Sequence, residues 1–282
     1  MGSSETAGFL GARRLREVLD VHGVRPVKAL GQNFVIDPNT IRKVVEVASV
    51  SADDRVLEIG AGAGSLTVGL AAVAAEVIAV EFDRRLLPVL AETLEGVTNV
   101  EVVPGDAMAL PLGGFGATKV VANLPYNIAV PVVVRVLETA PQIAELVVMT
   151  QREVGERLAA QPGSKAYGQV SVIVRYFGRP TVAAKVSRRA FFPVPRVDSV
   201  LVRIRREAPP DVAPERLFPV VRGAFSQRRK TIRNALISSG FADVDSALAA
   251  AGIDPGIRAE ALRLDDFVAV ANALATAAPP AE

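Results

Sequence analysis

The sequence predicts an α/β fold, in which helices cover both faces of a parallel sheet, followed by a small all-α domain. Short apolar segments alternate with helical segments between residues 55 and 150, the proline-rich segment Ala208–Pro214 interrupts the chain, and helical periodicity continues beyond it. The 282 residues, 50% of them hydrophobic and 22% charged, suffice for two domains with full cores. We expect these domains to comprise residues 1–207 and 208–282.

Two helices and then five strands are predicted in order along the first domain. The two helices, Leu10–Val24 and Pro38 to about Val50, flank an irregular stretch over Arg25–Asp37. The strands are short and apolar, with ranges Arg55–Ile59, Glu76–Val80, Val100–Val103, Lys119–Ala122 and Glu145–Thr150. Helical segments lie between them over Ser65–Ala74, Asp83–Leu94 and Val130–Thr139. Apolar strands of this kind are typical of a parallel sheet that is buried on both faces.

The pattern changes after Thr150. A helix over Arg152–Ala160 is expected to end at Pro162-Gly163-Ser164. Strands are then predicted over Val170–Tyr176, Thr181–Val186 and Ser199–Arg205, and we expect the first and last to form an antiparallel pair at the sheet edge. Beyond the proline-rich linker, helices are predicted over Glu215–Gly240, Val244–Ala251 and Leu264–Ala277.

The composition excludes several kinds of chemistry. The chain has no cysteine, which rules out disulfides, a thiolate nucleophile, zinc ribbons and iron–sulfur clusters, and His22 is its single histidine. Metal binding is not expected, and the chemistry is left to carboxylates, amides, hydroxyls, the backbone or a cofactor. Because no segment approaches the ~18 apolar residues of a membrane span and no signal peptide is evident, we expect a soluble cytoplasmic protein.

The charge is unevenly distributed along the chain. The net charge is only +2, but residues 152–233 contain 18 Lys and Arg against 6 Asp and Glu. A basic middle segment in an acidic frame is typical of a surface that meets a polyanion such as a nucleic acid. The alternative is that these arginines are solvated side chains of unrelated elements.

A glycine loop follows the first strand. Gly60-Ala61-Gly62-Ala63-Gly64-Ser65 lacks the third glycine of a dinucleotide fingerprint, and Glu58 just before it disfavours a pyrophosphate. Glu81 ends the next strand, twenty-one residues after Gly60, where an acid can hold a ribose diol. A cationic, phosphate-free nucleoside such as S-adenosylmethionine therefore fits better than a dinucleotide. The alternative is a glycine turn that serves only packing.

Two polar motifs follow the third and fourth strands. Asp106 could accept a hydrogen bond from an adenine amino group or cap a helix, and the two roles are compatible. In Asn123-Leu124-Pro125-Tyr126, the Asn123 amide oxygen and the Leu124 carbonyl could accept both N–H bonds of an adenine amine and aim its lone pair at a methyl group. Pro125 would stiffen the backbone and Tyr126 would stack on the base. The alternative is a plain turn with a half-buried tyrosine.

These motifs occur in an order that resembles a known family. The chain also contains Leu30-Gly31-Gln32-Asn33-Phe34-Val35, Pro162-Gly163-Ser164-Lys165-Ala166-Tyr167-Gly168 and Phe191-Phe192-Pro193-Val194-Pro195-Arg196-Val197-Asp198-Ser199. From about Leu10 to Phe267 it resembles the bacterial small-subunit ribosomal RNA adenine N6-dimethyltransferases, the family linked to kasugamycin resistance. The resemblance implies a Rossmann-like class I S-adenosylmethionine-dependent methyltransferase domain with a small C-terminal all-α domain.

The resemblance also implies roles for individual residues. The cofactor S-adenosylmethionine would be bound by Asn33, Val35, Gly60, Gly62, Glu81, Asp106 and Asn123, with Val35 in place of the leucine of most relatives. The substrate adenine would lie between Tyr126 and Phe191, held by Asn123 and Leu124 beside Pro125. Phe191 rather than Phe192 matches the Phe-x-Pro-x-Pro pattern, although the neighbouring Phe192 leaves that assignment open.

The implied substrate is a pair of adjacent adenosines in the 3'-terminal hairpin loop of small-subunit (16S) rRNA, each dimethylated at N6 during late ribosome assembly. The implied partner is the pre-30S or 30S ribosomal particle. The protein is expected to act on it as a monomer and to have no membrane partner. Residues Phe225–Asn234 resemble the family's basic helix, so Arg228, Arg229, Lys230 and Arg233 are expected to bind rRNA. The alternative for this segment is a solvated helix face.

Two other functions remain open at this point. A related resistance methyltransferase acts on a large-subunit adenosine, but Leu124-Pro125 and the Val197-Asp198-Ser199 ending favour the small-subunit enzyme. An assembly factor whose methylation is incidental is the second possibility. Intact Glu81, Asn123 and Tyr126 argue against a loss of catalysis.

Overall fold

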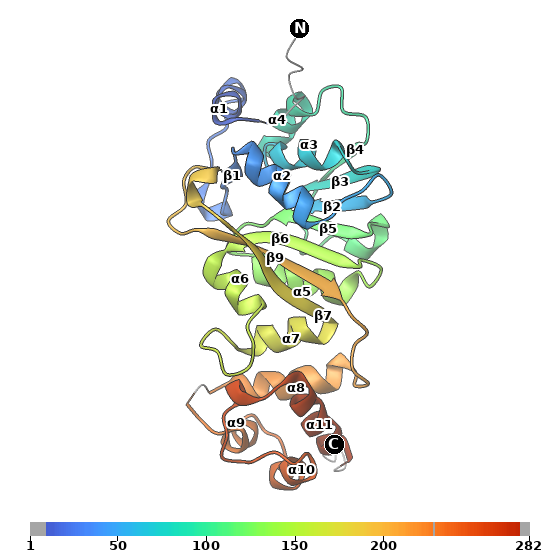
Figure 1. Cartoon of the computed structure of the whole chain (residues 1–282), viewed down its shortest axis with the longest axis vertical. Helices are drawn as coiled ribbons and strands as arrows, with labels where there is room; N and C mark the ends of the chain where they lie inside the picture. The colour runs from blue at the N-terminus through green and yellow to red at the C-terminus, as the bar shows by residue number, and fades with distance from the viewer. Residues whose placement is uncertain (1–9, 228, 277–282) are drawn as a thin grey trace. The chain divides into compact units, whose positions relative to one another are not determined.

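The computed structural model describes residues 10–227 and 229–276. The chain divides into two compact units, the first comprising Met1–Gly155 and Thr181–Arg206 and the second Glu156–Pro180 and Glu207–Glu282 (Figure 1). This division differs from the predicted domains because residues 156–180 group with the C-terminal helices. Tyr176 explains part of this grouping, since its ring packs edge-on against Phe218 at 5.2 Å and its hydroxyl donates to the Val212 carbonyl.

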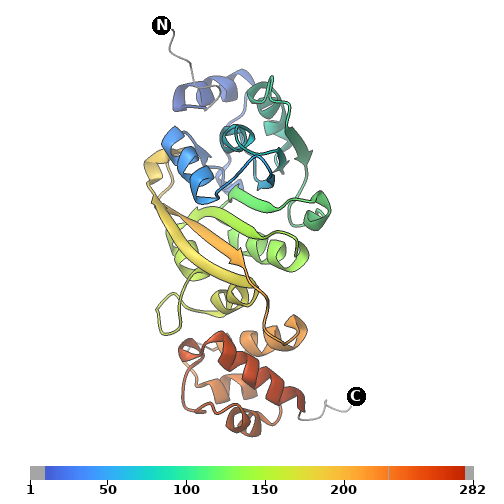
Figure 2. The same cartoon turned by 45° about the vertical axis from the view of Figure 1, so that its right-hand side comes forward.

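The first unit is built on a seven-stranded sheet, which confirms the predicted α/β class. Its strand order is β4-β3-β2-β5-β6-β9-β7. The first five of these strands are parallel, as expected: β4 (Val100–Pro104), β3 (Glu76–Glu81), β2 (Arg55–Ile59), β5 (Lys119–Asn123) and β6 (Glu145–Gln151). β9 (Ser199–Arg206) runs antiparallel to β6, and β7 (Gly178–Val186) lies beside β9 at the edge of the sheet (Figure 2).

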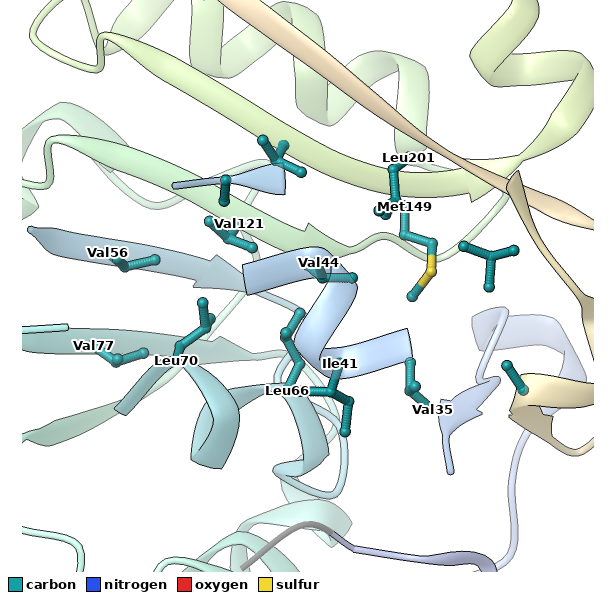
Figure 3. Packing of buried hydrophobic residues seen from close by; sticks show 14 of the residues in the cluster. Val35, Ile41, Val44, Val56, Leu66, Leu70, Val77, Val121, Met149 and Leu201 are labelled. Atoms are coloured by element: carbon teal, nitrogen blue, oxygen red, sulfur yellow. The ribbon is translucent and has the colours of Figure 1, made fainter. Parts of the chain in front are cut away.

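Helices cover this sheet with apolar side chains. The helices of the unit are α1 (Ala12–Val21), α2 (Pro38–Val47), α3 (Ser65–Ala71), α4 (Leu87–Thr93), α5 (Ala129–Thr139) and the start of α6 (Arg152–Leu158). α2 begins where Asp37 accepts hydrogen bonds from the backbone N–H groups of Asn39 and Thr40. Figure 3 shows Ile41 of α2 and Leu70 of α3 among the buried valines of the sheet. The burial of these side chains stabilises the packing of the helices on the sheet, from whose strands the loops of the functional site extend.

A short strand pair, which the sequence reasoning missed, lies outside the main sheet. β1 (Phe34–Val35) pairs antiparallel with β8 (Phe191–Phe192), in the register Phe34 with Phe192 and Val35 with Phe191. The predicted irregular stretch over Arg25–Asp37 therefore ends in a strand. The pair joins two segments that are far apart in the sequence.

The strand predicted over Val170–Tyr176 is wrong, because these residues form the helix α7 (Gln169–Phe177). The alternating valines are typical of a strand, but the side chains from Ser171 to Val174 are all buried, as in a helix covered on several sides. Ser171 fixes the start of the helix, since its hydroxyl accepts from the Gly168 N–H and donates to the Arg157 carbonyl. The predicted pairing of this segment with β9 is wrong for the same reason.

The second unit continues as helices, in agreement with the all-α prediction for the C-terminal part. They are α8 (Pro214–Phe225), α9 (Ile232–Ser238), α10 (Val244–Ala250) and α11 (Leu264–Thr276). The single helix predicted over Glu215–Gly240 is wrong, because the chain turns after Phe225 and Thr231 caps a new helix by accepting from the Asn234 N–H. Among the described residues, no helix is long and apolar enough to cross a membrane.

Candidate functional site

A cavity of about 300 Å³ opens at the carboxyl ends of the parallel strands in the first unit. It lies where the order of strands along the sheet reverses, with β3 and β4 on one side of β2 and β5 on the other. Such a reversal leaves a crevice in which α/β proteins bind ligands. The cavity is lined by residues 30–34, 59–60, 62, 80–83, 86, 105–108 and 123–128.

The glycine loop forms the floor of this cavity. Gly60 and Gly62 have φ angles of +80° and +62°, a backbone conformation that side chains other than glycine rarely adopt. A Cβ atom at Gly62 would lie 3.0 Å from Cδ1 of the Phe34 ring. The Gly60 N–H donates to the Val80 carbonyl at 2.8 Å, which ties the loop to β3. The loop therefore packs closely against its neighbours, as the packing alternative expects, and it also lines the cavity, as a cofactor site requires.

Glu81 lies beside the loop at the end of β3 and is buried. One carboxylate oxygen accepts the Gly62 N–H at 2.7 Å and the other accepts the Asp83 N–H at 2.7 Å. Burial raises the pKa of Glu81, and the backbone N–H donors oppose that shift. Each carboxylate oxygen has a further lone pair, so the group can still accept hydrogen bonds from two hydroxyls.

The charge of the lining suits a cationic ligand without phosphate. Three carboxylates, those of Glu81, Asp83 and Asp106, line the cavity, and Asp83 is paired with Arg85. No Lys or Arg stands among the described residues that line the cavity, so Glu81 and Asp106 supply its uncompensated negative charge. A pyrophosphate would find no cation here, whereas a sulfonium nucleoside would meet favourable charge. The glycine floor leaves room for close approach, and the volume lies in the range of small-molecule sites. The residues present therefore fit S-adenosylmethionine.

Asp106 is exposed, and one of its carboxylate oxygens accepts the Met108 N–H at 2.8 Å. No helix begins directly after Asp106 in the described structure, so the helix-capping role considered for it is wrong: its carboxylate closes a turn, and its other oxygen remains as an acceptor. Sequence reasoning missed two apolar neighbours, because the side chains of Phe82 and Met108 are 60% and 37% exposed on this cavity. The sequence signal that could have found Phe82 is its position directly after Glu81, the acid at the end of β3. Exposed apolar side chains at a cavity offer a surface to a flat ring.

The Asn123-Leu124-Pro125-Tyr126 segment also lines this cavity. Asn123 donates its amide N–H to the Asn33 carbonyl at 2.9 Å, which leaves the amide oxygen as its acceptor. The Leu124 N–H donates to Met149, and its carbonyl accepts none of the hydrogen bonds found within residues 10–227 and 229–276. The Tyr126 hydroxyl is hydrogen-bonded to the Ser199 hydroxyl at 2.8 Å. Two acceptors and a fixed aromatic ring thus occur within one tetrapeptide.

Gly31 packs closely against this tetrapeptide. It has a φ angle of +66°, and a Cβ atom there would lie 3.1 Å from Cβ of Pro125 and 3.3 Å from the backbone nitrogen of Tyr126. Together with the bond between Asn123 and Asn33, this contact holds residues 31–33 directly against the Asn123–Tyr126 segment.

Most of the site residues predicted from the sequence line this one cavity: Asn33, Gly60, Gly62, Glu81, Asp106, Asn123, Leu124, Pro125 and Tyr126. Two do not. Val35 and Phe191, which face each other in the β1–β8 pair, are 4% and 0% exposed and belong to the hydrophobic core. Because successive strand residues point to opposite faces, Phe192 lies elsewhere, beside the guanidinium of Arg16 at 4.8 Å. In this conformation the Phe191 ring is not exposed for a base to stack on.

The residues predicted to bind rRNA belong to the second unit. Arg229 and Lys230 are exposed between α8 and α9, and Arg228 lies outside the described residues. Arg233 differs from them because its guanidinium makes two hydrogen bonds to the Asp245 carboxylate, at 2.5 and 2.7 Å. Arg233 would have to share or exchange that partner in order to contact a phosphate.

Glu58 is a buried acid near the end of β2, two residues before the glycine loop begins at Gly60. It is 1% exposed, and its Oε2 atom has no hydrogen-bond partner in the described part of the chain. Burial, with a smaller contribution from the nearby Glu81, raises the pKa of Glu58 to about 8 against the opposing effect of Thr67. The folded protein therefore holds a proton on this side chain at neutral pH, while the unfolded chain does not.

Replacement of Glu58 by glutamine should change how stability depends on pH. Between pH 4.5 and about 8 the native state binds a proton that the unfolded state lacks, so the free energy of unfolding falls as the pH rises. At 1.36 kcal/mol per pKa unit, this group can contribute up to about 5 kcal/mol to that fall. Urea unfolding at pH 5 and pH 8.5 should show a flatter dependence in Glu58→Gln. The exposed Glu95→Gln variant is the control, and parallel profiles for wild type and Glu58→Gln would contradict the expectation.

The sheet topology, the glycine floor and the acid-lined cavity together define a Rossmann-like methyltransferase of the S-adenosylmethionine-dependent type. The family described as ribosomal RNA adenine dimethylase matches residues 25–276. This chain belongs to the ribosomal RNA adenine dimethylase family, which confirms the resemblance seen in the sequence.

Named relatives agree with this membership. The chain is 45% identical over 269 residues to the ribosomal RNA small subunit methyltransferase A of Moorella thermoacetica, covering 89% of this chain and 93% of that protein. The crystal structure of a dimethyladenosine transferase from Plasmodium falciparum is similar with a TM-score of 0.71 and 26% identity, over 84% of this chain and 95% of that one. The 23S rRNA methyltransferase ErmE is similar with a TM-score of 0.67 and 31% identity, over 86% and 99%.

Proposed function

We propose that this protein transfers methyl groups from S-adenosylmethionine to N6 of two adjacent adenosines in the 3'-terminal hairpin loop of small-subunit (16S) rRNA. It acts as a monomer on the pre-30S or 30S particle in the cytoplasm, and each adenosine is dimethylated. The observation that carries the proposal is the pair of acceptors at the acid-lined cavity, the Asn123 amide oxygen and the Leu124 carbonyl. The relative named as a small-subunit methyltransferase supports the choice of subunit.

The chemistry follows from these two acceptors. S-adenosylmethionine, when bound, supplies an electrophilic methyl group on a positively charged sulfur. The amine of adenine is a poor nucleophile because its lone pair is delocalised into the ring. Asn123 and Leu124 accept its two N–H bonds and thereby hold the nitrogen with its lone pair directed out of the ring plane. Tyr126, fixed through Ser199, stacks on the base and limits its rotation.

Proton transfer requires little from the protein. When the nitrogen accepts the methyl group, the bond between that group and sulfur breaks and the positive charge passes from sulfur to nitrogen, so a proton on the nitrogen becomes acidic and passes to water. Asn123 and Leu124 stabilise that charge through the same hydrogen bonds until the proton leaves. After one methylation a single N–H remains, and the second transfer uses one acceptor while the first methyl group occupies the place of the lost hydrogen.

The experiment that tests the proposal uses purified protein, labelled S-adenosylmethionine and undermethylated small and large ribosomal subunits in parallel. We expect label only in the small-subunit rRNA, recovered as N6,N6-dimethyladenosine. Label in the large-subunit rRNA would instead favour the activity in the name of ErmE. Absence of label on both, despite cofactor binding, would favour an assembly factor that has no transferase activity.

We further propose that the second unit binds rRNA through Arg228, Arg229, Lys230 and Arg233. Replacing the first three residues by glutamine should weaken binding to small subunits and flatten its salt dependence. Each lost phosphate contact makes the negative slope of log K against log salt shallower by roughly 0.7 to 0.9, so the slope of the triple variant should be shallower by roughly 2 to 3. Filter binding at several salt concentrations measures this. An unchanged slope would place the RNA surface elsewhere.

A further inference from the structure

A second cavity, of about 230 Å³, lies in the first unit next to the tyrosine that we assign to base stacking. We call it the basic cavity and define it by its lining residues: Arg152, Lys185, Val186, Ser187, Asp198 and Ser199. They come from the ends of three neighbouring strands, since Arg152 follows β6, Lys185 and Val186 end β7 and Ser199 begins β9. The cavity is thus built on the rigid sheet rather than on a free loop.

Backbone hydrogen bonds fix the shape of the basic cavity. The Arg152 N–H donates to the Asp198 carbonyl at 3.0 Å, and the Arg188 N–H donates to the Asp198 carboxylate at 3.0 Å. Asp198 therefore joins the segments that follow β6 and β7. Its carboxylate is engaged in that structural bond, so its charge is partly neutralised by a donor from the backbone.

Ser199 connects the basic cavity to the first one. Its side chain is fully buried, it lines the basic cavity, and its hydroxyl is hydrogen-bonded to the Tyr126 hydroxyl at 2.8 Å. Tyr126 in turn lines the acid-lined cavity. One buried serine therefore separates the ring that stacks on a base from a cavity bearing cationic side chains.

The polar groups of the basic cavity match a singly charged anion with several acceptor oxygens. Lys185 supplies a positive charge beside the carboxylate of Asp198, and Arg152, which is engaged in an interaction of its own, supplies a second. Ser187 adds an exposed hydroxyl whose oxygen accepts the Arg189 N–H at 3.3 Å and whose proton remains to be donated. Within the part of the chain that the structure describes, Lys185 has no ion-pair partner. A lysine with unused donors beside a hydroxyl is suited to a phosphodiester, which accepts hydrogen bonds and carries one negative charge.

We propose that the basic cavity binds a phosphodiester of the substrate RNA, adjacent to the adenosine whose base stacks on Tyr126, through Lys185 and Ser187. The proposal rests on the function proposed above and extends it by assigning a backbone contact inside the first unit. A base leaves its stack by rotation of the RNA backbone, and a phosphate held beside the flipped base keeps that rotated backbone in place. Recognition here is independent of sequence and complements the contacts of Asn123 and Leu124 with the base.

The test compares Lys185→Gln with Lys43→Gln, which removes the same charge from an exposed lysine on α2 that is paired with Glu46. Binding to a hairpin RNA containing the two adenosines is measured at several salt concentrations. We expect Lys185→Gln to make the negative slope of log K against log salt shallower by roughly 0.7, the value of one single-strand phosphate contact, and Lys43→Gln to leave it unchanged. Binding of S-adenosylhomocysteine, unchanged in both variants, verifies that they are folded.

A second measurement locates the phosphate. Single linkages near the two adenosines are replaced in turn by an uncharged methylphosphonate. We expect one replacement to weaken binding by wild type and to have no further effect on Lys185→Gln, with Ser187→Ala giving a smaller loss at the same linkage. Additive effects at every linkage, or an unchanged salt slope, in a wild-type protein that binds and methylates the RNA would overturn this inference alone. Failure of the wild type to bind or methylate any of these RNAs would overturn the proposed function as well.

Discussion

Replacing Asn123 with alanine should lower the rate of methyl transfer by about 100-fold or more. The amide oxygen of Asn123 is one of two acceptors that hold the adenine amine, and losing one preorganised group at the reacting atoms typically costs 10²–10³ in turnover. Cofactor affinity should fall much less, by under about tenfold. The only hydrogen bond that the structure gives this side chain within the described residues runs to the Asn33 carbonyl, and a bond of that kind contributes about 0.5–1.5 kcal/mol.

Single-turnover methylation and calorimetric titration with S-adenosylhomocysteine separate the two effects. Asn127→Ala is a matched control, because Asn127 also lines the cavity but is exposed, and its only described hydrogen bond is a long one of 3.5 Å to the Ala29 carbonyl. We expect that control to stay within about threefold of wild type, as for other surface substitutions. Equal losses of rate and cofactor affinity in Asn123→Ala would show that the residue only supports the cavity.

Glu81→Ala should weaken cofactor binding by more than about 100-fold. Two hydrogen bonds from ribose hydroxyls to a carboxylate are together worth about 3–6 kcal/mol. The substitution also leaves the Gly62 and Asp83 N–H groups without their acceptor, so the free energy of unfolding should fall by roughly 1–3 kcal/mol for each. Glu81→Gln keeps the size of the side chain and one acceptor oxygen, so it should fold more stably while still binding the cofactor poorly.

Calorimetric titration and urea unfolding of both variants, beside the exposed Glu101→Ala control on β4, measure these losses. A folded Glu81→Gln protein with wild-type cofactor affinity would remove Glu81 from the cofactor site.

The same variants test an additional role in assembly. A protein that binds immature subunits but cannot methylate them should accumulate on them and slow their maturation, whereas a pure transferase should not.

The parts of the site that the sequence predicted are those encoded by local motifs. The glycine loop, Glu81, Asp106 and the Asn123–Tyr126 segment each follow a strand directly, and parallel strands bring their carboxyl ends to one edge of a sheet whatever the details of packing. The identity of each strand as an apolar run was sufficient to place them. The same reasoning succeeded for the order of helices and strands between Arg55 and Thr150.

The parts that failed depend on contacts distant in sequence. The burial of Phe191 is set by the register of β8 on β1, and two-residue strands have no periodicity to recognise. α7 reads as a strand because the aromatic contacts that favour its helical form come from α8. The basic excess over residues 152–233 indicated a surface for a polyanion but could not place the basic cavity, since Arg152, Lys185 and Ser199 are scattered over nearly fifty positions and meet only through strand order.

The contact of residues 31–33 with the Asn123–Tyr126 segment has a thermodynamic consequence. Gly31 packs against Pro125 and Tyr126, and the Asn123 amide donates a hydrogen bond to the Asn33 carbonyl, so we expect a shift of one segment to move the other. Both segments line the acid-lined cavity, and we assign residues 31–33 to the cofactor and the Asn123–Tyr126 segment to the base. We therefore expect occupancy of either site to change the affinity of the other, and linkage requires that the two factors be equal.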